Sequence, residues 1–537
     1  MKARRFVAVV LAATLLLLGL AVGGWWLVRQ GSPLRLQHQA LTLPRSARFV
    51  PRQAALSVFL LADGEQPVRY ARAVASTAQR RQAAAAVEGL RDGAFAAAGL
   101  NYRDELASWL GSETALALTG PEAGSEPAGW LLALNSRSGD GARRFLQRFW
   151  QTRSLAGTGL QVSSYRGMGL ISGQVALVGQ EAVPMATALI DDDLVLLASG
   201  RGVLEQALDV SQIDELNQAG DPRFLKALER LKQGALVLTM RPADLGPWMA
   251  LPGESPDGLG SITMSIQPQG RQLAIEALIE PTGFPDEGVG ASADDISWSQ
   301  QLDPAMSADL LDGLPGDVTR LALLQDPAHW TKVWSDLLPG VLSPAGGPLP
   351  ALVASLDAGP LLWSEGPLGW LLGTTADQPD PDDLQPGVVS LGLQPSTLGM
   401  PEGLEDVRVW THLEARSAPR RKADPDSQLE VSLAAARSSD AELAWWGQTL
   451  AVLEEQRGGG RGPRQLRRIL DELELPTAPL QWAGSAEQTG DLLAGWSPWR
   501  LLSGLAGQPL GEGVKGLALA LEPDGQGLHL RARLDYR

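Results

Sequence analysis

The longest apolar run of the chain lies near its N-terminus. Residues Phe6 to Val28 follow one another without a charged side chain, and a helix needs about 20 such residues to cross the hydrocarbon core of a membrane. Lys2, Arg4 and Arg5 precede the run, so the positive-inside rule leaves the N-terminus in the cytoplasm. We therefore expect segment 1–28 to be a cytoplasmic tip and an uncleaved transmembrane anchor that contacts the lipid bilayer.

A cleaved signal peptide is the alternative interpretation of this run. The apolar region of a signal peptide has roughly 7–15 residues and ends in small residues before the cleavage site. This run is longer and ends in Gly23-Gly24-Trp25-Trp26-Leu27-Val28. Paired tryptophans are typical of the membrane interface, which favours the anchor.

Beyond the anchor, apolar residues alternate with polar ones or form short runs that end in Gly, Asp or Pro. Both patterns are typical of strands joined by hairpins. Asp191-Asp192-Asp193 separates the apolar runs Ala186–Ile190 and Leu194–Ser199, which predicts a tight hairpin turn. Stretches with helical spacing, Pro222–Lys232 and Arg464–Leu473, fall between hairpins. The predicted fold class is α+β: an N-terminal transmembrane helix followed by two similar units of mainly antiparallel sheet with packed helices.

The two units are expected because two long segments show the same order of elements. The strand Leu56–Leu61 opens the first, and Leu321–Leu324, followed by a helical stretch Pro327–Leu338, opens the second. The first closes with Leu273–Leu278 and the second with Leu528–Leu534. We interpret this as a duplication, with a linker at 29–47, unit 1 at 48–281, a linker or long loop at 282–312, and unit 2 at 313–537. Chance similarity between two α+β segments is the alternative.

One correspondence in the middle of the repeat is less regular. The strand Trp130–Arg137 precedes a helix that ends at Trp150. Its expected counterpart is the strand Leu429–Arg437, followed by a helix through Trp445, Trp446 and Leu453.

Composition excludes several kinds of site. The net charge of −16 disfavours nucleic acid and anionic lipid surfaces as partners, while soluble cations and basic proteins are better matched. The chain has no cysteine, which excludes disulfides, thiolate metal sites and cysteine nucleophiles. An apolar content of 44% is enough for a folded core.

The search for catalytic, cofactor and metal residues ends without a candidate. The four histidines His38, His329, His412 and His529 lie too far apart in sequence for a helical metal motif, and we interpret His529 as a surface or edge residue of a strand. Two acidic clusters, one at residues 191–193 and one from Asp377 to Asp383, lack the spacing of a calcium loop, so we interpret them as solvated turns. Glycine-rich Gly458–Gly462 is interpreted as a flexible connector, because no strand precedes it and it lies between two expected helices.

Two surface features each have two interpretations. The basic helix Arg143–Trp150 could dip into a membrane surface, but we favour packing of its apolar face onto a sheet, with the arginines in water. The basic face of Arg464, Arg467 and Arg468 is expected to be balanced by nearby acids. The 17 tryptophans could line a glycan or peptide groove, but most lie within apolar runs, which favours the core.

Three blocks carry a resemblance to a known family. These are Phe49-Val50-Pro51, the block Trp109-Leu110-Gly111-Ser112-Glu113, and the run from Tyr165-Arg166-Gly167 to Leu194-Val195-Leu196. In them the chain resembles the cyanobacterial domain-of-unknown-function proteins numbered thirty-three fifty-two, over nearly the whole body. The resemblance implies an N-terminal membrane anchor, an uncharacterised body in the periplasm or thylakoid lumen, and a plasma or thylakoid membrane. It supplies no active-site residues.

These observations favour a non-enzymatic, membrane-tethered binding or scaffolding module, with an extracytoplasmic protein as candidate partner. One alternative is an envelope or lumenal hydrolase that uses dispersed Asp and Glu residues, because carboxylates distant in sequence can form an acid–base pair. Another is a carrier that holds an apolar ligand between sheet and helices.

Overall fold

The structure is a computed structural model of the 537-residue chain. It describes residues 32–119, 129–154, 160–176, 182–244, 259–281, 302–327, 348–357, 359–399, 407–416, 428–440, 442–458, 462–524 and 527–536. The predicted anchor, residues 6–28, and His329 lie outside the described residues.

Strands dominate these ranges. The strands are β1 (Leu56–Leu60), β2 (Leu110–Thr119), β3 (Gly129–Ser136), β4 (Gln161–Tyr165), β5 (Met168–Val175), β6 (Val183–Ile190), β7 (Leu194–Ala198), β8 (Leu236–Met240), β9 (Leu259–Gln269), β10 (Gln272–Pro281), β11 (Arg320–Leu324), β12 (Leu361–Gly366), β13 (Gly369–Thr375), β14 (Leu393–Leu398), β15 (Val407–Arg416), β16 (Gln428–Ser439), β17 (Leu443–Gly447), β18 (Leu480–Ser485), β19 (Val514–Asp524) and β20 (Gly527–Tyr536).

Helices follow the strands in both halves of the sequence. The α-helices are α2 (Gln66–Val74), α3 (Arg80–Ala97), α4 (Gly139–Arg153), α5 (Arg201–Val210), α6 (Pro222–Leu231), α8 (Pro304–Asp312), α10 (Pro348–Leu356), α11 (Gln385–Ser390), α12 (Leu450–Arg457), α13 (Arg464–Asp471), α14 (Ala486–Gly495) and α15 (Ser497–Ala506). Shorter helical turns include η1 (Pro33–His38) and η2 (Arg45–Phe49). The first lies within the predicted linker at 29–47, and the second lies across its end.

The chain divides into two compact units. Unit 1 comprises Met1–Met240, Thr263–Arg271 and Leu502–Pro509, and unit 2 comprises Arg241–Ile262, Gln272–Leu501 and Leu510–Arg537. Each unit therefore contains segments that are far apart in the sequence.

In unit 1 the antiparallel strands pair in the order β8–β1–β2–β3–β7–β6–β5–β4. Because side chains alternate along each strand, apolar residues reach both faces. One core cluster joins the strands to Leu204 of α5 and Phe224 of α6, and the other joins them to Phe145 and Phe149 of α4. Helices thus cover both faces of these strands, with the core on either side.

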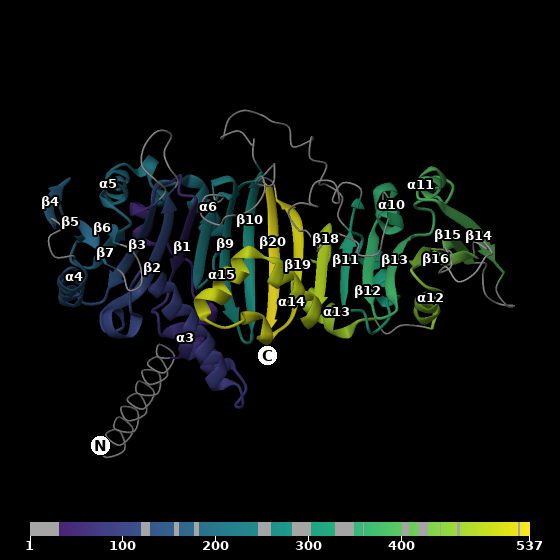
Figure 1. Ribbon diagram of the computed structural model, residues 1–537, viewed down its shortest axis with the longest axis horizontal. Helices are drawn as coiled ribbons and strands as arrows, with labels where there is room; N and C mark the ends of the chain where they lie inside the picture. Colours follow the sequence, from purple (N-terminus) through teal and green to yellow (C-terminus); the bar gives the residue numbers. More distant parts are fainter. Residues whose placement is uncertain are drawn as a thin grey trace, which may run out of the picture. The chain divides into compact units, whose positions relative to one another are not determined.

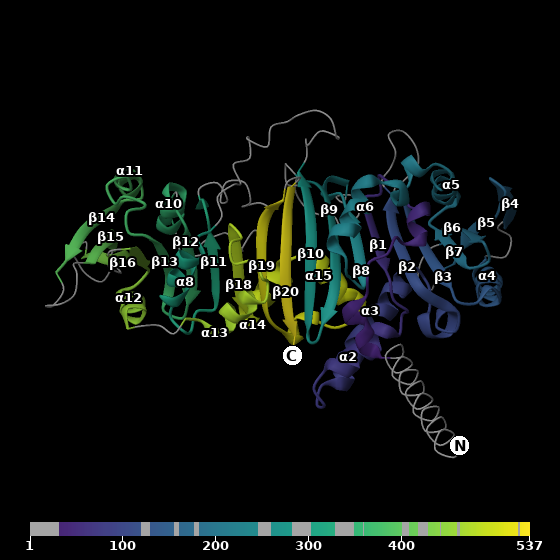
Figure 2. The ribbon, with the colours of Figure 1, turned by 180° about the vertical axis from the view of Figure 1, so that it is seen from behind.

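In unit 2 the order is β10–β20–β19–β18–β11–β12–β13–β17–β16–β15–β14, again antiparallel throughout (Figure 1). Val353 of α10 packs with Val388 of α11 and Leu493 of α14 against one face. Leu310 of α8 and Ile469 of α13 pack with α12 against the other. Figure 2 shows the same strands from behind.

The two units share one strand order. From β8 to β4 in unit 1, and from β18 to β14 in unit 2, each strand has a counterpart with the same neighbours. A duplication would leave this arrangement, and the duplication and its boundaries stay a prediction. In the shared strand order, β13 is the counterpart of β3. The sequence pattern makes the β16 segment the counterpart of the β3 segment.

The predicted fold class, α+β, is wrong, and the predicted N-terminal transmembrane helix lies outside the described residues. The structure is a large antiparallel β architecture of twenty strands with helices against it. Among the residues that the structure describes, no helix is long and apolar enough to cross a membrane. Short apolar runs do not distinguish a strand from a buried helix, and this ambiguity hides part of the strand content from the sequence pattern.

Trp445 and Trp446 show this ambiguity. The sequence predicts a helix through both residues that continues to Leu453, but they belong to β17, and α12 begins only at Leu450. Thr449 caps that helix by accepting a hydrogen bond from the backbone N–H of Val452 at 3.3 Å.

The locally encoded elements are confirmed. β6 and β7 form the predicted hairpin around residues 191–193, where Asp191 and Asp192 adopt positive φ angles of 46° and 64°. Helices α6 and α13 match the predicted stretches to within two residues at their ends. A turn, a cap and an apolar stripe act within about ten residues, so the sequence specifies them directly.

Candidate functional site

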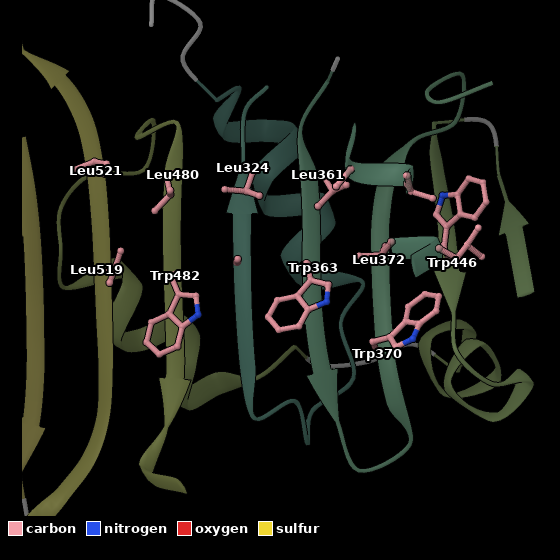
Figure 3. Packing of buried hydrophobic residues seen from close by; sticks show 14 of the residues in the cluster. Leu324, Leu361, Trp363, Trp370, Leu372, Trp446, Leu480, Trp482, Leu519 and Leu521 are labelled. Carbon is pink, nitrogen blue, oxygen red and sulfur yellow. The ribbon is translucent and has the colours of Figure 1, made fainter. Parts of the chain in front are cut away.

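One face of unit 2 carries a row of large side chains that crosses the strands. Residues directly opposite each other in antiparallel strands point to the same face, and the pairing registers place these side chains in line. The row reads Leu519, Trp482, Ala322, Trp363, Leu372, Trp446, Arg437 and Arg408. Figure 3 shows Leu519, Trp482, Trp363, Leu372 and Trp446 of this row. Trp363, Trp446 and Trp482 are at most 3% exposed. The tryptophans thus form core, as expected, and the row ends in two arginines.

The half-buried Arg437 is held at the edge of this core. Its guanidinium lies 5.2 Å from the ring centroid of Trp446, a cation–π contact. Nη2 donates to the carbonyl of Ala376 at 3.0 Å and Nη1 to Ser439 Oγ at 3.3 Å, while the buried Nε–H has no hydrogen-bond partner. Burial lowers the pKa of Arg437, Arg408 lowers it further, and Asp380 opposes both. Arg437 is therefore a cation with unused donor capacity.

Next to this region, at the ends of β11 and β13 and the start of β12, lies a buried carboxyl group. Asp357 follows α10 and is 1% exposed. Oδ1 accepts a hydrogen bond from the Gly359 N–H at 2.9 Å, and Oδ2 has no partner. Burial raises the pKa of Asp357 to about 7, against the lowering effect of the Gly359 N–H, and the charges of Asp377 and Asp326 raise it further. The buried Thr375 Oγ1 is also without a partner.

Strands β14, β15 and β16 form one end of the strand order of unit 2, with Arg408 on β15 and Arg437 on β16. The face of these strands opposite to the two arginines carries exposed apolar side chains. Leu413 and Val431 lie opposite each other across β15 and β16 and are 45% and 61% exposed. Leu433, two residues from Val431 on the same strand, is also exposed. In the described residues β14 pairs only with β15, so one of its edges is open.

The terminal strand of unit 1 has the same character. β4 pairs only with β5 within the described chain, and it holds the position in unit 1 that β14 holds in unit 2. Val162 is 73% exposed, and the preceding Leu160 is 45% exposed. Each unit thus ends in a strand with an open edge and with apolar side chains in water nearby.

The histidines do not assemble into a site within the described residues. His529 is not the surface or edge residue that we expected, because β20 lies between β10 and β19 and the side chain is 13% exposed. Its Nδ1 lies 3.1 Å from Glu522 and its Nε2 lies 4.0 Å from Glu276. Across the described ranges, no three or more His, Asp or Glu side chains are placed to hold a metal ion.

The acidic turn of unit 1 is neutralised by arginine. Arg45 pairs with Asp191 and Asp193, and Arg143 pairs with Asp192 at 2.5 Å. The side chains of the three aspartates are at least 40% exposed, as expected of a solvated turn, and they also form ion pairs with arginine. The second acidic cluster lies after β13, where Asp380 accepts a hydrogen bond from the N–H of Asp382 at 2.9 Å.

The two basic helices pack as expected. Phe145 and Phe149 of α4 are at most 5% exposed, which confirms packing of the apolar face of this helix. On α13, Arg467 pairs with Asp312, and Arg468 pairs with Asp535 at 3.3 Å and with Glu472 at 3.7 Å. The carboxylates that balance this face therefore come partly from other elements.

Sequence reasoning missed Asp357 and the Arg408–Arg437 pair. Two local signals were present. Asp357 directly follows an apolar stretch that ends at Leu356, and Arg437 ends the apolar run of β16. Neither signal indicates burial or a partner, because the strands that surround these residues come from distant parts of the sequence.

Comparisons with known proteins add a family but no activity. No curated protein matches the chain. Crystal forms III and I of TP0453 align with 9% and 10% identity, each covering 45% of this chain and 81% of TP0453, with TM-scores of 0.26 and 0.25. Likeness at this level supports no conclusion about fold or function. A family model described as "Protein of unknown function (DUF3352)" matches residues 9–350, well over half of the sequence. The chain therefore belongs to the DUF3352 family.

Proposed function

We propose that the chain is a non-enzymatic binding module for protein partners, and that β4 in unit 1 and β14, β15 and β16 in unit 2 form the binding surfaces. The observation that carries the proposal is the exposure of apolar side chains on these strands in both units. Val162 in unit 1 and Val431 in unit 2 leave most of their surface in water. Clustered exposed apolar side chains are typical of interaction sites.

The open strand edges support the same proposal. A strand with unpaired backbone N–H and C=O groups can accept an extended segment of another chain, which adds main-chain hydrogen bonds to the apolar contacts. Pro395 in β14 has no backbone N–H to donate. β4 contains no proline.

The alternatives have weaker support from the described residues. Asp357 has the raised pKa of a catalytic acid, but it is almost fully buried and its carboxyl oxygens meet no second acid within hydrogen-bond distance. The tryptophan face, where a carrier would hold an apolar ligand, is packed against side chains of α10, α11 and α14. Exposed strands at equivalent ends of both units therefore favour binding.

The test is site-specific photo-crosslinking in cells that contain the full chain. A photoreactive residue replaces Val162, Val431 or, as a matched control, Val389, which lies on α11 and is 66% exposed. We expect one or more discrete protein adducts from the positions on β4 and β16, and none of the same size from the helix.

A second experiment asks whether the crosslinked protein depends on the apolar surface. Val162→Asp and Val431→Asp should each weaken its co-purification, whereas Val389→Asp should leave it unchanged. Thermal unfolding of each variant checks that the fold is intact. Equal adducts from all three positions, or no effect of either strand substitution on co-purification, would count against the proposal.

A further inference from the structure

Arg408 and Arg437 form a pair of like charges on neighbouring strands. They lie directly opposite each other on β15 and β16, on the same face, although like charges in this arrangement destabilise a sheet. Neither forms an ion pair with a carboxylate anywhere in the described chain. This is notable in a protein with 61 acidic residues and a net charge of −16.

Three other arginines with little exposure do have carboxylate partners, whereas Arg531 of β20 also has a buried Nε–H without a partner. Arg91, 8% exposed, pairs with Glu65 at 2.7 Å, and Arg153, 16% exposed, pairs with Glu105 at 2.7 Å. Arg320 lies over the ring of Trp363, as Arg437 lies over Trp446, and it pairs with Glu365. Both arginines lie against a buried tryptophan, but a carboxylate neutralises the charge of Arg320, and no carboxylate of the described chain forms an ion pair with Arg437.

The surroundings of the arginine pair provide further hydrogen-bond donors. Thr397 of β14 lies opposite Arg408, and Ser439 lies two residues from Arg437 on the same strand, so both point to the face of the arginines. Arg408 and Thr397 are exposed. The Nε–H of Arg437 has no hydrogen-bond partner, but it is buried. The exposed guanidinium of Arg408 and the exposed hydroxyl of Thr397 lie on adjacent strands and can both donate to a carboxylate.

We propose that Arg408 binds the carboxylate of an acidic side chain on an extended partner segment that lies along β14, and that Arg437 behind it adds positive charge to the site. The inference rests on the proposed function, because it assigns the partner's chemistry at the same surface. A local positive pair on an acidic protein orients an incoming acidic segment and rejects a basic one. The carboxylate would also relieve the repulsion between the two guanidinium groups.

The test compares two fluorescein-labelled probe peptides that differ in one group. The first is Thr-Thr-Val-Thr-Glu-Thr-Val-Thr-Thr, and the second has Gln in place of Glu. Fluorescence anisotropy with the full chain measures both dissociation constants at low ionic strength. We expect the Glu peptide to bind about tenfold more tightly, the factor that one charge-assisted hydrogen bond at a partly exposed site supplies.

Substitutions assign the difference to Arg408. Arg408→Gln, at an exposed position, should abolish most of the preference for Glu. Arg437→Lys keeps the positive charge behind Arg408 and should leave most of the preference in place. Arg144→Gln, at an exposed position on α4, is the matched control and should change neither constant.

The outcomes separate the two proposals. If both peptides bind the unaltered chain equally well, the carboxylate site is refuted and strand binding stands. If neither peptide binds, strand binding at β14 and the carboxylate site are both refuted. A preference for Glu that survives Arg408→Gln would refute the assignment of the carboxylate to Arg408.

Discussion

Replacing Asp357 by Asn should make the stability of unit 2 less dependent on pH. Asn has nearly the same shape, and its carbonyl oxygen can still accept the hydrogen bond from the Gly359 N–H. The substitution removes only the ability to ionise. It therefore isolates the cost of a buried negative charge.

The sign and size follow from the pKa of Asp357. The ordinary pKa of an aspartate is 3.8, and the folded protein raises the pKa of Asp357 to about 7. Between these values the unfolded chain loses the proton while the folded chain keeps it, so the stability of the native protein falls as the pH rises through this window. The full difference, reached above about pH 7, corresponds to about 4 kcal/mol, and relaxation around the charge reduces it.

The assay is urea unfolding followed by tryptophan fluorescence at about pH 5 and about pH 8. Asp357→Asn should stabilise the protein by a few kcal/mol at the higher pH and by less, about 1–2 kcal/mol, at the lower pH, where the unfolded carboxyl is already ionised. Asp383→Asn, at an exposed position in the same unit, is the control and should have little effect at either pH. The reasoning fails if Asp357→Asn destabilises the protein at the higher pH, or shifts its stability equally at both pH values.

Three further predictions concern stability, measured by the same urea assay. Trp446→Ala should cost about 3–5 kcal/mol, because it removes a fully buried indole from the core, and a loss below about 1 kcal/mol would contradict the packing described. Arg153→Met should lower the free energy of unfolding by about 3 kcal/mol, because it leaves Glu105 without its buried partner. Adding Glu105→Gln should recover part of this loss. If the two substitutions change the free energy of unfolding additively, the pair is not coupled. Lys232→Gly should stabilise unit 1 by about 1 kcal/mol, because the φ of 59° and ψ of −41° at this helix end favour glycine, and a loss of stability would show that the lysine side chain matters more.

Features encoded within a few residues could be predicted. The aspartates at 191–193 separate two apolar runs by the length of a tight turn, and their positive φ angles are ones that Asp tolerates. The arginines and phenylalanines of α4 alternate with helical spacing, which correctly placed Phe145 and Phe149 in the core.

The candidate site could not be predicted because it depends on strand register. Arg437 faces Arg408 only because β16 pairs with β15 in one register, and a shift by one residue would turn its side chain to the other face. Asp357 is buried by elements before and after it, and no local pattern shows that its carboxyl oxygen lacks a partner. The ion partners of Asp191 and Asp193 likewise come from Arg45, far back in the chain.

The segment Leu502–Pro509 has a consequence for biosynthesis. It belongs to unit 1, although residues 272–501 separate it from Arg271, the last residue of the earlier parts of that unit. At a translation rate of about 5–20 residues per second, unit 1 remains incomplete for roughly ten to fifty seconds after its other parts have been made. A premature stop before residue 502 leaves both units unfinished. Truncation at the apparent boundary between the halves is therefore a poor way to obtain either unit alone.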